Sequence, residues 1–139
     1  WTGQLQSLLG DEFYVIEEGL PGRTTNLDDP DSVKNGLTYL VPCLKSHETI
    51  DYLVIMLGTN DLKYKFNRTV EDIAKGVEDL IETARAYTQA TILLISPVHI
   101  DPTAPRFFFF YTTITSLKPL RECHQKSASL VITANTVYP

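Results

Sequence analysis

The sequence has few of the features that mark membrane-spanning or nucleic-acid-binding proteins. No apolar run approaches the roughly 18 residues that a membrane-spanning helix needs. Lysine and arginine number 12 against 17 aspartates and glutamates, and the basic residues form no cluster. A net charge of −5 argues against a nucleic-acid footprint. Neither a nucleic acid nor a membrane span is therefore expected.

Cysteine and histidine are also scarce. The two cysteines, Cys43 and Cys123, lie far apart, without a Cys-x-x-Cys motif. Such residues are more often buried free thiols than a disulfide, which favours a reducing, cytoplasmic location. The histidines are scattered (His47, His99 and His124), and no pair of His or Cys has the spacing of a metal site. With no glycine-rich nucleotide motif either, no cofactor and no metal is predicted.

The remaining composition is that of one soluble globular domain. The 139 residues are 43% hydrophobic and 21% charged, which suffices for a real core. No linker or internal repeat divides residues 1–139, so a single domain is expected. The chain begins at Trp1, without an initiator methionine or a signal peptide, and is expected to be the central part of a longer polypeptide.

The most hydrophobic element is the run Leu53–Leu57. It is short enough for a strand and has no polar alternation, which indicates a strand buried on both faces of a parallel sheet. It ends on Gly58-Thr59-Asn60-Asp61. Parallel sheets bind ligands outside the carboxyl ends of their strands, so Asn60 is expected at the edge of a crevice.

Helical and strand patterns alternate along the rest of the chain. The strong amphipathic pattern from Val70 to Ala84 follows a capping box, Thr69 to Asp72, and Pro42 is expected to kink or end an earlier helix. Helices are expected at 1–9, 33–44, 70–84 and 116–129, and strands at 13–16, 53–57, 91–97 and 130–133. This order predicts an α/β fold, a three-layer α/β/α sandwich around a parallel sheet. The run Phe107–Phe110 has no assigned role.

Two strand-end loops, Gly19–Thr25 and Gly58–Lys63, carry the candidate site. Gly22 offers a backbone N–H that can approach a ligand closely, and Asn60 offers a side-chain amide. Two neutral donors that converge on one point form an oxyanion hole, which stabilises charge on a carbonyl oxygen. The alternative is that Gly22 only shapes a turn and Asn60 only caps the next segment. The spacing alone leaves both interpretations open.

These loops resemble a known family. Gly58-Thr59-Asn60-Asp61 is similar to the GxND block of the SGNH, or GDSL-type, hydrolases, and Glu17–Thr25 with Asp28-Asp29-Pro30 is similar to their arylesterase/acetylesterase branch. Three further segments add to the resemblance: 34–36, 42–44 and 95–97. It implies a flavodoxin-like sheet of order 2-1-3-4-5, of which the chain would supply strands 2 to 5. It also implies acyl transfer on a small-molecule ester through serine, histidine and aspartate, with Gly22 and Asn60 as the oxyanion hole.

The same resemblance shows what these 139 residues do not contain. No Gly-Asp-Ser block and no Asp-x-x-His block is present, and Gly10-Asp11-Glu12 has Glu where the nucleophile belongs. Ser96 and His99 are not expected to replace them, since Pro97 has no amide to donate. These residues alone are therefore predicted to be inactive. Without the first strand, a gap between strands 2 and 3 and poor independent folding are also predicted.

Two other function classes stay open from the sequence. The absent nucleophile favours a catalytically inactive binding or structural protein on the same fold. Flavodoxin-like cofactor binding rests on fold analogy alone. The physiological ester and the oligomeric state, a homo-oligomer included, are not determined by the sequence.

Overall fold

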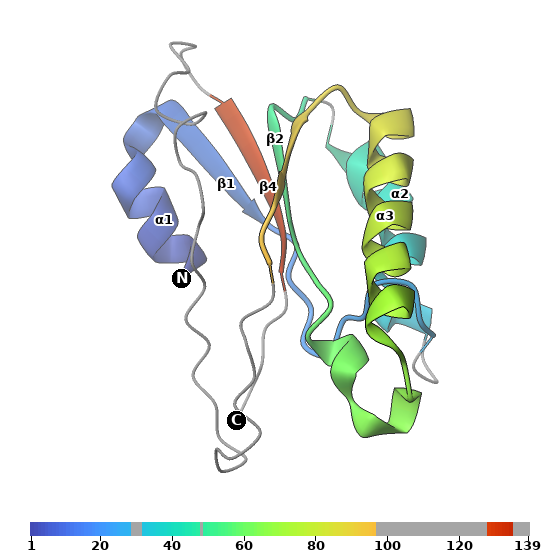
Figure 1. Ribbon diagram of the computed structural model, residues 1–139. Coiled ribbons are helices and arrows are strands. Elements are labelled where there is room, and N and C mark those ends of the chain that lie inside the picture. Colours follow the sequence, from blue (N-terminus) through green and yellow to red (C-terminus); the bar gives the residue numbers. More distant parts are fainter. Residues whose placement is uncertain (29–31, 48, 97–127, 135–139) are drawn as a thin grey trace.

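The computed structural model describes residues 1–28, 32–47, 49–96 and 128–134. Within them four parallel strands form one sheet in the order β1-β4-β2-β3, with bounds β1 Phe13–Glu17, β2 Tyr52–Met56, β3 Thr91–Leu94 and β4 Ala128–Ala134. Three α-helices accompany it, α1 Thr2–Leu9, α2 Gly36–Ser46 and α3 Val70–Tyr87. Figure 1 shows α1 on one face of the sheet and α2 with α3 on the other. The predicted α/β class with a parallel sheet is confirmed.

Strand β2 is the buried element that its apolar run predicted. It pairs with β4 on one side and with β3 on the other, and Leu53 and Ile55 are 0% exposed. Their side chains belong to the core between the sheet and α2 with α3. Tyr52 and Val54, on the alternate face, belong to the core beside α1. Both faces of β2 are therefore covered.

Each helix packs through one apolar face, as its spacing predicted, but not with every predicted residue. Val33 precedes α2 and is 63% exposed, and Val70, the first residue of α3, is 74% exposed. Leu5 and Leu9 pack against the core, whereas Leu8 is 84% and Trp1 50% exposed, so these two do not share the buried face. The core residues of α2 and α3 that lie against the sheet are Leu40, Cys43, Leu44, Leu80 and Ala84. Of the helices in the described residues, none combines the length and apolar character that crossing a membrane requires.

Pro42 was expected to kink or end the helix, and the structure shows that it does not end α2. It lies inside the helix, which continues to Ser46. Proline removes one backbone hydrogen bond and disfavours a helix interior. The neighbouring side chains of Leu40 and Leu44 are 2% and 5% exposed, so their burial in the core offsets that local penalty.

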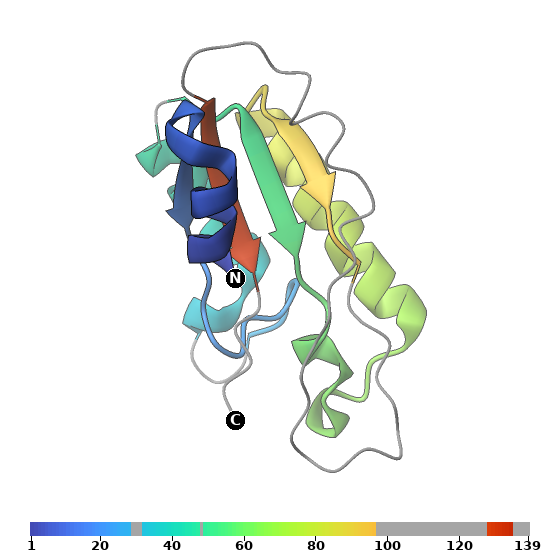
Figure 2. The ribbon, with the colours of Figure 1, turned by 90° about the vertical axis from the view of Figure 1, so that its left-hand side faces the viewer.

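The position of the last strand is the main correction to the predicted topology. The resemblance placed it beyond β3 and left a gap between β1 and β2. Instead β4 lies in that gap, pairing in parallel with β1 (Phe13↔Ala128) and with β2 (Tyr52↔Leu130) (Figure 2). Unpaired N–H and C=O groups on two facing strand edges are costly, and an apolar segment of strand length satisfies both edges at once.

The helix predicted for 116–129 is wrong at its end, because Ala128 and Ser129 belong to β4. The rest of that prediction, the phenylalanine run 107–110, and the residues Cys123, His99 and His124 lie outside the described residues.

Candidate active site

The two predicted loops leave the carboxyl ends of β1 and β2, on the same edge of the sheet. Each contains a glycine in the left-handed region, Gly22 with φ +80° and Gly58 with φ +114°. L-residues with a Cβ rarely adopt these angles, so glycine is required for both chain reversals. A Cβ on Gly22 would lie 3.6 Å from the side chain of Lys34, an ordinary van der Waals contact, so the positive φ and not crowding requires glycine here.

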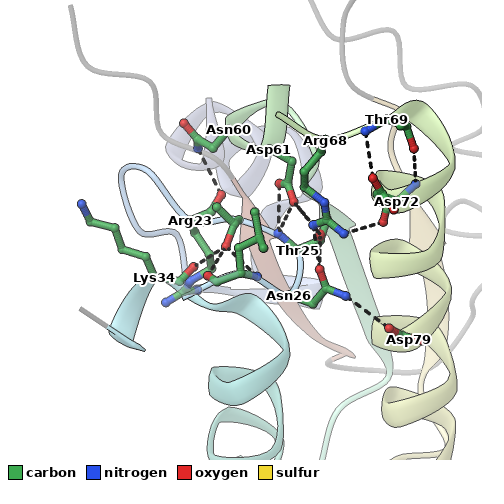
Figure 3. Close-up of polar contacts among 12 residues, drawn as sticks. Arg23, Thr25, Asn26, Lys34, Asn60, Asp61, Arg68, Thr69, Asp72 and Asp79 are labelled. Atoms are coloured by element: carbon green, nitrogen blue, oxygen red, sulfur yellow. Dashed lines mark hydrogen bonds and ion pairs between the residues drawn. The ribbon is translucent and has the colours of Figure 1, made fainter. Parts of the chain in front are cut away.

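Asn60 joins the two loops directly. It begins a short 3₁₀ helix, Asn60–Leu62, and its residue is only 7% exposed. Its side-chain Nδ2 donates a hydrogen bond to the backbone carbonyl of Arg23 at 3.1 Å (Figure 3). Arg23 follows Gly22 in the chain, so the amide of Asn60 contacts the first loop one residue beyond Gly22. The structure thus brings together the two loops that the sequence predicted to converge.

Asp61, the next residue, connects the two loops on their buried side. It is 0% exposed, and its carboxylate accepts the backbone N–H of Thr25 at 3.1 and 3.0 Å and the Thr25 hydroxyl at 2.6 Å. Three contacts to one residue fix both the position and the orientation of the first loop. Hydrogen bonds to an ionised acceptor are the stronger kind.

The buried charge of Asp61 is balanced by Arg68. Its Nη1 lies 2.9 Å from Oδ1 of Asp61, and the two side chains are 11% and 0% exposed. The same guanidinium donates to Oδ1 of Asn26 at 2.7 Å and to the carbonyl of Asp72 at 2.6 Å (Figure 3). Because Asp72 lies in the first turn of α3, the arginine connects the site to the start of that helix. A charge that is both paired and hydrogen-bonded can be buried.

Helices α2 and α3 approach the first loop so closely that only glycine fits. A Cβ on Gly36, at the start of α2, would lie 2.7 Å from the carbonyl of Thr24. A Cβ on Gly76 of α3 would lie 2.3 Å from the hydroxyl of Thr25. The loop is bonded to the segment before α2 as well, since the N–H of Thr24 donates to the Lys34 carbonyl at 2.9 Å. The loop's conformation is thus fixed by its neighbours.

A second cluster of polar side chains lies behind the first loop, between the end of β1 and α2. The hydroxyl of Tyr39 donates to Glu18, and Nε2 of His47 lies 3.0 Å from the other carboxylate oxygen of Glu18. Burial alone would raise the pKa of Glu18, but these two hydrogen bonds hold it below its usual value. The bond to Glu18 in turn raises the pKa of Tyr39 to about 12.

Arg23 and Cys43 complete this cluster. The Arg23 guanidinium lies over the Tyr39 ring, 4.0 Å from its centroid, and donates to the Glu18 carbonyl. Burial lowers the pKa of Arg23. Burial, with the charge of Glu18, raises the pKa of the Cys43 thiol to about 11. Cys43 is a buried free thiol, as the sequence predicted.

Sequence reasoning missed several members of this site. The link from Asp61 to Thr25 and the ion pair with Arg68 join residues far apart in the chain, and no local pattern marks such a bond. No metal is predicted from Cys43 and His47, and the structure places both side chains beside Glu18. Ser96 is exposed, and because His99 lies outside the described residues, the structure does not test a pairing between them.

Three comparisons with known proteins bear on this site. The sequence model of the GDSL-like lipase/acylhydrolase family matches residues 1–126. A search of curated proteins finds no match.

The inhibitor-bound aryl esterase of M. smegmatis has 46% sequence identity and a TM-score of 0.64, over 70% of this chain and 50% of that one. Est24, a carbohydrate acetylesterase from Sinorhizobium meliloti, has 42% identity and a TM-score of 0.70, over 73% and 52%. Another carbohydrate acetylesterase family member from that organism has 37% identity and a TM-score of 0.68, over 75% and 53%. The chain thus spans about half the length of these structures.

Proposed function

The chain belongs to the GDSL-like lipase/acylhydrolase family, and we propose that it is the central portion of a serine-dependent carboxylic ester hydrolase. In this proposal its residues supply the oxyanion hole, while the serine nucleophile and its histidine and aspartate come from the family's GDS and DxxH blocks. Ester hydrolysis needs no cofactor, and none is proposed.

The observation that carries the proposal is the 3.1 Å bond from Asn60 Nδ2 to the carbonyl of Arg23. A primary amide has two N–H donors, and this bond uses one of them. It holds the amide against the first loop, one residue beyond Gly22, and in this proposal the second N–H and the Gly22 N–H face one oxygen. Donors held in place before the reaction stabilise the oxyanion without reorganising during it.

The chain's own residues would contribute to the reaction in three ways. Gly22 and Asn60 would bind the oxygen of the ester carbonyl, and more tightly as negative charge develops on it. Asp61 would hold both donors in register through Thr25. The Arg68 guanidinium would balance the charge of the Asp61 carboxylate at 2.9 Å without placing a free charge at the reacting carbonyl.

The resemblance also suggests where the nucleophile would enter. In a sheet of order 2-1-3-4-5 the first strand lies between the strands that correspond to β1 and β2, which is the position of β4 in this chain. We propose that in the complete protein the strand ending in Gly-Asp-Ser takes this position. Its serine would then emerge at the same sheet edge as Gly22 and Asn60.

Small acyl esters are the proposed substrates. The matched structures are named as an aryl esterase and carbohydrate acetylesterases. An acetyl ester of a phenol, such as p-nitrophenyl acetate, is therefore a suitable first substrate. The complete gene product is expected to hydrolyse it, and to be labelled on serine by a fluorophosphonate probe.

The alternative is a catalytically inactive binding or structural protein on the same fold. This alternative is favoured by the absence of a Gly-Asp-Ser block from these residues. The two experiments separate the proposals. Hydrolysis together with serine labelling supports the esterase, whereas a folded gene product that shows neither activity nor labelling supports the inactive protein.

A further inference from the structure

Three side chains of different chemistry meet behind the first loop, and they have no part in the proposed acyl transfer. They are Glu18, which directly follows β1, Cys43 within α2, and His47, which ends α2. Their ligand atoms, a carboxylate oxygen, a sulfur and an imidazole nitrogen, all lie within 4.8 Å of one another. Glu18, Cys43 and His47 are called the α2 donor cluster below.

One donor lies within a helix, and the other two directly follow regular elements. Cys43 is part of α2, and His47 is the C-cap residue that directly follows this helix. Glu18 directly follows β1. The three donors therefore come from α2, from its end and from the end of β1.

The donor types and distances suit a borderline first-row cation. Thiolate and imidazole are the preferred ligands of Zn²⁺, and a carboxylate is its common third ligand. Zn–S and Zn–N bonds of about 2.3 and 2.0 Å place the ligand atoms of a tetrahedral ion roughly 3.4–3.5 Å apart. Nε2 of His47 and Oε1 of Glu18 are 3.0 Å apart, and the sulfur of Cys43 lies within 4.8 Å of both, so side-chain adjustment must bring the three atoms to this spacing when the ion binds.

The surroundings of the cluster resemble those of known metal sites in one further respect. Tyr39 lies one turn before Cys43 on α2 and donates its hydroxyl to Oε2 of Glu18. The other oxygen, Oε1, faces His47. Partners that hydrogen-bond a ligating carboxylate fix its orientation and tune its affinity for the metal. Arg23, stacked on the Tyr39 ring, holds that tyrosine in place.

A simpler interpretation is a Glu18–His47 ion pair beside a thiol that only fills space. Buried cysteines often behave as small apolar residues. That interpretation explains the 3.0 Å contact, but it assigns no role to a sulfur placed within 4.8 Å of both partners. Cys43 is 2% exposed, while the side chains of His47 and Glu18 are 22% and 20% exposed, so an ion can enter from the solvent side.

We propose that Glu18, Cys43 and His47 bind one Zn²⁺ or a similar divalent cation, with solvent as a fourth ligand. Binding would release the thiol proton, because the ligand is the thiolate. The ion would tie the end of β1 to the end of α2, and so fix the start of the loop that carries Gly22. The proposal does not depend on the esterase proposal, because none of its ligands acts in acyl transfer.

The test is a titration of the complete gene product with Co²⁺, a spectroscopic substitute for Zn²⁺, followed by competition with Zn²⁺. We expect one equivalent to bind, with a thiolate-to-cobalt charge-transfer band that Zn²⁺ abolishes. Cys43→Ser should remove the band. His47→Gln and Glu18→Gln should each weaken binding by more than roughly 10–100-fold, which is the cost of losing a residue that only hydrogen-bonds to a metal ligand.

Matched controls are available in the same chain. Cys123→Ser and His124→Gln remove the other cysteine and another histidine, and both should bind Co²⁺ as the wild type does. Tyr39→Phe keeps the ring but not the hydroxyl and should weaken binding roughly 10–100-fold. Circular dichroism checks that each variant is folded, and His47, whose side chain is 22% exposed, makes His47→Gln the variant least at risk.

Three results would overturn the proposal. They are the absence of stoichiometric Co²⁺ binding by the folded wild type, a thiolate band that persists in Cys43→Ser, and unchanged affinity in folded His47→Gln. A band lost only in Cys123→Ser would assign the thiolate to the other cysteine and would also refute this site.

Discussion

The carboxylate of Asp61 accepts the backbone N–H of Thr25 through both of its oxygens, at 3.1 and 3.0 Å, across 36 residues of sequence. Both residues are 0% exposed. The bond connects the loop after β2 to the loop after β1 at a point hidden from solvent. The relative position of Gly22 and Asn60 depends on it, because each lies within three residues of one partner.

Removing the Asp61 carboxylate should be strongly destabilising. Asp61→Ala would leave the nearly buried Arg68 guanidinium and the Thr25 N–H without their partner. Loss of one member of a buried ion pair typically costs about 3–5 kcal/mol. Chemical denaturation of the wild type and the variant measures this difference in the free energy of unfolding.

The exposed ion pair on α3 is the matched control. Lys75 lies 2.8 Å from Glu78, and both side chains are more than half exposed. Lys75→Ala should leave the free energy of unfolding nearly unchanged, because solvent screens the pair. Equal costs for the two substitutions would show that Asp61 is not the link described here.

Gly76→Ala should destabilise the protein although alanine favours a helix. In an open helix interior the change would gain about 1 kcal/mol. Here the new Cβ would lie 2.3 Å from the Thr25 hydroxyl, which is too close for any contact. Overpacking of this kind costs about 1–3 kcal/mol, and it would displace the loop from α3.

Gly3→Ala in α1 is expected to stabilise the protein, which is the opposite of the effect of Gly76→Ala. Nothing lies within 4 Å of a Cβ at Gly3, so only the helix propensity changes. We expect a gain of up to about 1 kcal/mol. Thermal unfolding of the two variants side by side provides the measurement, and a stabilising Gly76→Ala would contradict the close contact between α3 and Thr25.

The capping box of α3 should make the stability of the protein depend on pH in the acid range. The backbone N–H of Thr69 donates to Asp72 at 2.9 Å, and this bond lowers the pKa of Asp72 below its ordinary 3.8. A lowered carboxyl pKa contributes stability that is fully present above the unfolded-state pKa and is lost as the pH falls through the folded-state value. Wild type and Asp72→Asn should therefore differ near neutral pH and converge in acid.

Thr69→Ala tests the other half of the same capping box. The Thr69 hydroxyl accepts the backbone N–H of Asp72 at 3.1 Å, and its loss should cost about 0.5–2 kcal/mol. An NMR titration should place the pKa of Asp72 nearer its ordinary value in this variant. An unchanged pKa and an unchanged unfolding curve would contradict the reciprocal capping seen here.

The elements with strong local patterns could be predicted from the sequence. The apolar run of β2, the box at Thr69 and the spacing of α3 each depend on neighbours in the chain, and each is confirmed. The exposure of Leu8 and the survival of α2 past Pro42 could not be predicted, because tertiary packing decides them. The position of β4 was missed for the same reason, since filling the gap between two strands is a property of the whole sheet.

The predicted gap was the reason for expecting poor independent folding. In the structure β4 closes it, so that reason no longer holds, and thermal unfolding of the 139-residue chain decides the matter. The site was predicted in part: the convergence of the loops of Gly22 and Asn60 is confirmed, whereas their catalytic roles and the cytoplasmic location stay predictions.

The most direct test of the central claim is the turnover of Asn60→Ala in the complete gene product with p-nitrophenyl acetate. Loss of one oxyanion donor should lower kcat by roughly 10²–10³ with KM nearly unchanged, because the donor acts mainly in the transition state. Asn67→Gly, at an exposed asparagine with φ +45°, is the control and should keep wild-type turnover. A folded Asn60→Ala enzyme with wild-type kcat would contradict the oxyanion hole.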